Sequence, residues 1–146
     1  LGSVSTTSNY SYYSDNGQKY VKGSNTSYGA SYNVGDIIGV AVDLDNNKLY
    51  FSKNGTWQNS GVPTSGSTGT GAISIDAVSS TTNGYYLPAS GDYGSSQYVT
   101  NQFNFGNGYF GTTAVASAGT NASNLGIFEY DVPAGYTALC TKGLNE

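Results

Sequence analysis

The feature that most limits the fold of this chain is an alternating apolar segment that leads into tight turns. Every second residue from 38 to 44 is large and apolar, namely Ile38, Val40, Val42 and Leu44. A period of two predicts a β-strand with one buried face. Residues 45–48 (DNNK) predict a turn, residues 49–53 alternate again, and Asn54-Gly55 is a strong turn dipeptide. Residues 35–55 therefore predict a β-hairpin.

The rest of the sequence predicts further short strands and no helix. The chain has 21 Gly and is rich in Ser, Thr and Asn, and these residue types weaken helices. Its 14 Tyr and 5 Phe are too many for a disordered chain. We expect seven or eight strands in one domain covering residues 1–146. Besides the hairpin, the expected strands cover residues 18–22, 72–78, 85–89, 97–105, 127–130 and part of 137–144, with loops at 23–27 and 58–71.

The ionisable side chains exclude several functions. The net charge is −4 and the five basic residues are all Lys, so we expect neither nucleic-acid binding nor an anionic membrane surface as partner. No apolar run is long enough for a membrane helix. His is absent and Cys140 is the single cysteine, which excludes Ser-His-Asp and Cys-His pairs and His/Cys zinc clusters. We interpret Cys140 as a small buried apolar residue.

Two weaker patterns carry little weight. Residues 43–47 (DLDNN) resemble the start of a calcium loop, but Lys48 stands where that loop needs Gly and Asn54 where it needs Glu. Pairs of carboxylates could serve a glycosidase, but most Asp residues here lie in or beside expected turns, where Asp is common. We therefore expect no enzyme activity, no cofactor and no metal.

Several segments, taken in order, resemble the SPRY domain family. Residues 35–55 (GDIIGVAVDLDNNKLYFSKNG) are similar to its central hairpin signature. Residues 86–90 (YLPAS) resemble its tyrosine-proline-alanine-valine-serine strand, and residues 104–106 (NFG) with Phe110 resemble its late asparagine-phenylalanine-glycine segment. Residues 128–145 are similar to the ends of SPRY-like proteins of bacteriophages and marine viral sequences. The resemblance covers residues 28–145.

The resemblance implies an all-β fold, a bent antiparallel β-sandwich. It places the recognisable core at residues 34–146 and leaves residues 1–33 as a polar, Tyr-rich N-terminal part. The family's first strands are either missing here or replaced by residues 1–33. If they are missing, another segment or chain would have to cover an open sheet edge.

A binding surface is expected on tyrosine-rich loops. SPRY proteins that bind peptides do so with loops at one end of the sandwich, which by position correspond here to Tyr12, Tyr13, Asp92 and Tyr93. Packing in the core is the alternative interpretation for these tyrosines. Of the neighbours Tyr85 and Tyr86, one is expected to pack inward. Because Tyr rings also stack on sugar faces, a glycan is a plausible ligand.

The leading functional hypothesis is a non-enzymatic structural or binding module of a phage or virus particle: a fibre, decoration or appendage protein. Its location would be the virion or the extracellular space. Its partners would be other virion subunits, with the chain as a homo-oligomer, and a host surface protein or glycan. The alternative is an intracellular SPRY-type interaction module that binds a short peptide motif.

Overall fold

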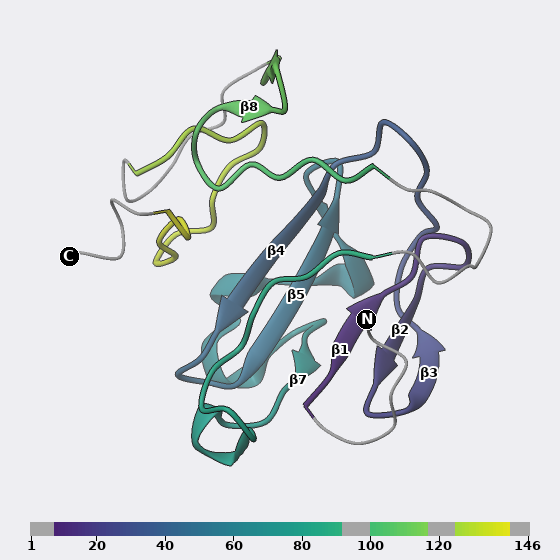
Figure 1. Ribbon diagram of the computed structural model, residues 1–146. Coiled ribbons are helices and arrows are strands. Elements are labelled where there is room, and N and C mark those ends of the chain that lie inside the picture. The colour runs from purple at the N-terminus through teal and green to yellow at the C-terminus, as the bar shows by residue number, and fades with distance from the viewer. Residues whose placement is uncertain (1–7, 92–99, 117–124, 141–146) are drawn as a thin grey trace. The chain divides into compact units, whose positions relative to one another are not determined.

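A computed structural model describes residues 8–91, 100–116 and 125–140 (Figure 1). The chain divides into two compact units, Leu1–Tyr98 and Val99–Glu146, and each is described by itself. Both consist of short strands in antiparallel sheets, joined in the first unit by short 3-10 helices, which confirms the all-β fold class. None of the helices among the described residues has the length and apolar character of a membrane span. That residues 1–146 form one folding domain stays a prediction.

The first sheet is built from the N-terminal part of the chain. It contains β1 (Tyr10–Tyr12), β2 (Gln18–Val21) and β3 (Ser24–Ser27), in that order and antiparallel. The strand expected at 18–22 is confirmed, but the loop expected at 23–27 is wrong, because Ser24–Ser27 pairs with β2 throughout. The two residues between these strands, Lys22 and Gly23, have φ values of 49° and 92°. Positive φ at both positions gives the turn twist that joins adjacent antiparallel strands.

The second sheet contains the expected hairpin, formed by β4 (Ile38–Asp43) and β5 (Lys48–Lys53). On its other side β5 pairs with two short strands, β6 (Thr56–Trp57) and β7 (Ile73–Ser74). Asn54 and Gly55 have φ values of 47° and 79°, so they form the predicted tight turn between β5 and β6. The prediction of a β-hairpin within residues 35–55 is confirmed.

The burial of β4 differs from the sequence expectation. Val40 and Val42 are 54% and 39% exposed and Leu44 is about half exposed, whereas the intervening Ala41 is buried. Val40 and Val42 pair with Phe51 and Leu49 of β5, and the packed cluster of the first unit lies on these β5 residues. The valines therefore share the apolar face of the hairpin without being covered like their partners.

Three short 3-10 helices occupy stretches that were expected as loop or strand. They are η1 (Gln58–Ser60), η2 (Pro63–Thr68) and η3 (Val78–Ser80). The strand expected at 72–78 is reduced to β7, and its end becomes η3. Residues 85–89 form no strand, which corrects the prediction there. Pro88 has no backbone N–H to donate to a neighbouring strand. The Tyr86 side chain holds this stretch instead, because its hydroxyl donates to the Asp76 carbonyl.

The core of the first unit combines tyrosine rings with aliphatic side chains. Its buried members are Tyr12, Tyr28, Leu49, Ile73 and Ile75, so it joins the first sheet and the segment after it to the second sheet. The N-terminal part, whose sequence is mostly polar, also contributes to this core, because β1 directs Tyr10 and Tyr12 to one face and both join the cluster. A Tyr-x-Tyr pair among polar residues is a weak sequence signal for a strand that packs into a core.

The second unit has little regular structure in its described residues. Its strands are β8 (Tyr109–Phe110) and β9 (Thr113–Ala114), which form a two-stranded hairpin. The strand expected at 97–105 is absent over 100–105, while 97–99 lie outside the described residues. Residues 127–130 contribute one isolated bridge, Asn107 to Ile127, and no strand occurs at 137–140. Cys140 is half-buried rather than fully buried.

Candidate functional site

Two surface features of the first unit could bind a partner. The first is the exposed apolar side chains of Val40, Val42 and Leu44, which we call the valine strip. Along the strip β4 is an edge strand, because among the described residues it pairs only with β5. Exposed apolar area beside an unpaired strand edge is a usual place for protein contact.

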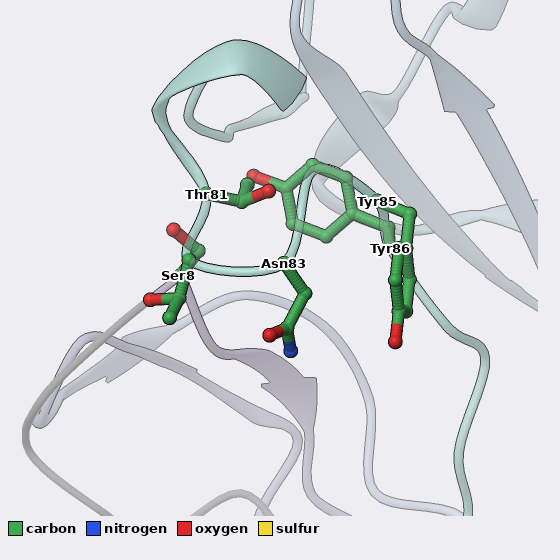
Figure 2. A pocket seen from close by; sticks show the side chains of 6 residues that line it. Ser8, Thr81, Asn83, Tyr85 and Tyr86 are labelled. Atoms are coloured by element: carbon green, nitrogen blue, oxygen red, sulfur yellow. The ribbon is translucent and has the colours of Figure 1, made fainter.

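The second feature is a shallow pocket of about 100 Å³, shown in Figure 2. It lies between the start of the first sheet and the loop that follows η3, and we call it the polar pocket. Its lining contains hydroxyl, amide and phenol groups and no charged side chain: Ser8, Thr81, Thr82, Asn83, Tyr85 and Tyr86.

One wall of the polar pocket is fixed by Asp76. The hydroxyl of Ser8 donates to the Asp76 carboxylate at 2.8 Å, and the hydroxyl of Tyr86 donates to the Asp76 carbonyl oxygen at 2.8 Å. The backbone N–H of Asp76 in turn donates to the Tyr10 hydroxyl at 2.9 Å. The Tyr10 and Tyr86 rings meet edge to face at 6.1 Å. Thr81 is also held, because its hydroxyl donates to the Val78 carbonyl at 2.8 Å.

The other lining residues of the pocket offer free polar groups. Thr82, Asn83 and Tyr85 are exposed, and none of their side chains has a hydrogen-bond partner among the described residues. The Tyr85 ring is 55% exposed. The pocket therefore combines a held wall with an accessible aromatic ring and an accessible carboxamide.

The charges next to the pocket compensate one another. The ammonium of Lys22 lies 2.6 Å from the Asp76 carboxylate. The bonds from Lys22 and Ser8 keep the pKa of Asp76 below its ordinary value. Burial raises the pKa of the Tyr10 phenol well above its ordinary value, so that group stays neutral. A ligand in the pocket would meet neutral groups backed by an ion pair.

Of the four residues expected from the sequence as a loop surface, the structure describes two, Tyr12 and Tyr13. Tyr12 is wrong as a loop residue: it ends β1, is 7% exposed, and its ring packs on those of Tyr28, Tyr32 and Phe51. Its hydroxyl donates to the Ala30 carbonyl. Tyr12 therefore fits the alternative interpretation, packing in the core. Tyr13 is half-buried and meets the Tyr20 ring at 6.0 Å. Asp92 and Tyr93 lie outside the described residues.

The polar pocket was only partly visible in the sequence. The expectation that one of Tyr85 and Tyr86 packs inward is confirmed: Tyr86 packs against the core and Tyr85 is exposed. Sequence reasoning missed Ser8, Thr81, Thr82 and Asn83. They stand in runs of Ser, Thr and Asn, which look alike throughout this chain, so only the fold distinguishes them.

The hairpin signature has a structural role. Asp36 accepts the backbone N–H of Asn33 at 2.8 Å and the side-chain amide of Asn54 at 2.6 Å, and the Lys53 ammonium lies 3.1 Å away. Asn54 in turn accepts the backbone N–H of Ile37 at 2.8 Å. These bonds, led by that of Asn33, lower the pKa of Asp36. Asp36 thus accepts hydrogen bonds from a backbone amide and a side-chain amide that flank the hairpin strands.

The calcium-like segment is explained by its turn. The Asp43 carboxylate accepts the backbone N–H and the side-chain amide of Asn46, at 2.9 and 2.8 Å. Such bonds close a hairpin turn without an ion. Across the three described ranges, no group of three or more His, Cys, Asp or Glu side chains could hold a metal.

The fold defines a class: an all-β, sandwich-like module whose hairpin is locked by an Asp-Asn-Lys cluster. The SPRY domain family matches residues 2–86, which is more than half of the chain. The chain belongs to the SPRY domain family. Searches of curated proteins and of solved structures each found no match.

The extent of the match corrects the sequence expectation. We placed the resemblance at residues 28–145, but the matched region begins at residue 2 and ends at Tyr86. The Tyr-rich N-terminal part is therefore inside the family region, as its contribution to the core also requires. The segments at 104–106 and 128–145 lie beyond the match. Both the valine strip and the polar pocket lie within it.

Proposed function

We propose that this chain is a non-enzymatic module that binds a protein partner through the valine strip. SPRY domains are protein-interaction modules and are generally non-enzymatic, and the family match is the observation that carries the proposal. The strip adds a place for the contact, because it puts three exposed apolar side chains beside the free edge of β4. An extended peptide can add to such an edge with its backbone and place alternate side chains on the apolar face.

The valine strip can be tested with a displayed library of random peptides. Selection against the wild-type chain should enrich peptides with alternating apolar residues. The double variant Val40→Thr/Val42→Thr keeps the branched shape and strand preference but removes apolar area, and it should bind these peptides at least about tenfold more weakly.

Val62→Thr is the matched control, since Val62 is similarly exposed (44%) but lies before η2 and outside the strip. Its binding should equal that of the wild-type chain. The proposal fails if no peptide is enriched, or if the double variant binds the selected peptides as well as wild type does.

A second proposal concerns where the module works. On the sequence resemblance of residues 128–145 alone, we propose a role in a virus particle, as an appendage or decoration subunit that assembles or attaches to a host surface. Peptide mass spectrometry on density-purified particles tests this role. Peptides of the chain at a fixed ratio to the major capsid protein would support it. Their absence from particles and presence in the soluble cell fraction would reject it in favour of an intracellular module.

A further inference from the structure

We propose that the polar pocket binds one neutral sugar residue of the hexose type. This inference goes beyond the proposed protein contact, which uses the valine strip. It rests on three properties of the pocket: the chemistry of its free groups, its size, and the way its walls are held.

The free groups of the pocket match the chemistry of a sugar. A sugar hydroxyl both donates and accepts, and the Asn83 carboxamide and the Thr82 hydroxyl each offer both functions. Neighbouring hydroxyls of one ring can therefore bond to the carboxamide oxygen and to its NH₂ group together. The exposed Tyr85 ring supplies an electron-rich face for the C–H bonds of the same sugar, in the way that positive ring edges meet aromatic faces.

Size and charge argue against other small ligands. A pocket of about 100 Å³ is well below the several hundred Å³ of a site that encloses a drug-sized molecule, so it has room to cradle one ring or one short group. A phosphate or sulfate would need a free cation, but the neighbouring Lys22 is paired with Asp76. Residues 81–86 belong to no strand, so the pocket has no ladder edge on which an extended peptide could add.

The held wall makes binding by so small a ligand feasible. Ser8, Thr81 and Tyr86 already spend their hydroxyl protons on Asp76 and Val78, which fixes their rotamers before any ligand arrives. Their oxygens keep lone pairs that can accept from a ligand hydroxyl. A wall ordered in advance lowers the entropy lost on binding, while Thr82, Asn83 and Tyr85 remain available to adapt.

Saturation-transfer NMR with the full chain tests the proposal. The probes are the methyl glycosides of glucose, galactose and mannose, each titrated into the millimolar range, where a single sugar on a shallow site is expected to bind. At least one should receive saturation on its ring C–H protons. Tyr85→Ala and Asn83→Ala should each weaken it about tenfold or more, whereas Tyr85→Phe, which keeps the ring, should bind nearly as wild type does.

Tyr109→Ala is the matched control, because Tyr109 is exposed to a similar degree (48%) and is not among the residues that line the pocket. It should leave sugar binding unchanged, and so should the Val40→Thr/Val42→Thr variant. The inference is overturned if no glycoside binds, or if binding survives both Tyr85→Ala and Asn83→Ala. In either case peptide binding at the valine strip would still stand or fall by its own experiment.

A glycan array then identifies the source of the sugar. Binding to neutral glycans linked to protein would point to a glycoprotein partner, and binding to neutral polysaccharides would point to a surface polymer. Both results support a sugar site. Selective binding to sulfated or sialylated glycans would overturn the neutral-sugar assignment.

Discussion

The phenolic oxygen of Tyr28 accepts a hydrogen bond from the backbone N–H of Phe51 at 3.0 Å. β7 pairs with the first two residues of β5 and β6 pairs with its last two, so Phe51 lies between the two short strands on that edge. Tyr28 thus provides the acceptor that a longer neighbouring strand would have supplied. It is also a buried member of the core cluster, so one side chain joins the N-terminal part of the chain to the central strand of the hairpin sheet.

Replacing Tyr28 by Phe should therefore destabilise the fold although it keeps the ring. The substitution leaves a partly buried backbone N–H without its partner, which costs about 1–3 kcal/mol in the free energy of unfolding. Urea unfolding followed by circular dichroism measures the change. Tyr109→Phe, at an exposed site, should leave the unfolding midpoint where it is in the wild-type chain. Equal midpoints for Tyr28→Phe and wild type would show that the Tyr28 bond contributes nothing.

The hairpin of β4 and β5 shows how much of this fold the sequence can predict. Its strands alternate, and the Asn54-Gly55 turn that follows β5 needs positive φ at two positions that Asn and Gly readily adopt. Local preference and tertiary pairing agree there, so both strands follow from the pattern.

The first sheet could not be predicted in the same way. β3 contains only Ser, Asn and Thr, and all four of its residues are exposed. Its pairing with β2 depends on the turn at Lys22-Gly23, and Lys at the first turn position is a weak signal for positive φ. The prediction for residues 85–89 fails for the opposite reason. Their apolar and aromatic residues are typical of a strand, but the Tyr86 side chain holds the segment in place without strand pairing.

The polar pocket, too, could be predicted from the sequence only in part. Tyr85 and Tyr86 could be separated into one exposed and one packed ring, because adjacent residues in extended chain point to opposite sides. Which Ser, Thr and Asn residues lie beside them depends on the Asp76 bonds, which join Ser8 to a segment 68 positions later in the sequence. Contacts so distant in sequence leave no local pattern.

Stability should fall in acid because of Asp36. The bonds from Asn33, Asn54 and Lys53 lower its pKa in the fold below the ordinary 3.8. The unfolded chain then binds a proton more readily than the folded one in acid. The stabilisation is complete above the ordinary value and is lost as the pH falls through the lowered pKa. Urea midpoints measured from pH 6 to about 2 should show this fall, and Asp36→Asn should flatten it.

Asp76→Asn is a comparison for the acid experiment, because the bonds of Lys22 and Ser8 also lower the pKa of Asp76. It should flatten a separate part of the same decline. An acid profile that Asp36→Asn leaves unchanged would mean that the hairpin cluster does not favour the charged carboxylate.

Stability should also fall in alkali because of the aromatic core. Burial is the main cause that raises the pKa values of Tyr10, Tyr12, Tyr28 and Tyr32 above the ordinary 10.0. These phenols stay neutral in the fold, whereas the unfolded chain ionises them from about pH 10. The stabilisation is therefore complete below pH 10 and declines as the pH rises toward the raised values. Urea midpoints and tyrosinate absorbance, recorded together, should show unfolding and the late ionisation of these groups as one event.

Tyr32→Phe removes one of these four phenols and should make the alkaline decline less steep. Its ring still packs on Tyr12, but the bond from the Tyr32 hydroxyl to the Tyr12 carbonyl is lost, so its midpoint at pH 7 is the reference for its own profile. If all tyrosines ionise near pH 10 while the far-ultraviolet signal stays folded, the core phenols are accessible and the prediction fails.

Gly17, the glycine of the turn between β1 and β2, should tolerate substitution poorly. Its φ is +67°, and a Cβ at this position would lie 2.1 Å from the backbone carbonyl oxygen of Gly29. The Gly29 N–H also donates to the Gly17 carbonyl at 2.9 Å. The backbone at Gly29 therefore cannot move away from Gly17 without losing this bond. Gly17→Ala should therefore combine backbone strain with a collision against backbone, and lower the free energy of unfolding by about 3 kcal/mol or more.

Gly84→Ala separates the two effects, because Gly84 has a similar φ of +74° but no atom within 4 Å of its Cβ position. It should show the strain alone, about 1 kcal/mol in urea unfolding, and equal losses at the two sites would show that the close approach of Gly17 to Gly29 is relieved at little cost.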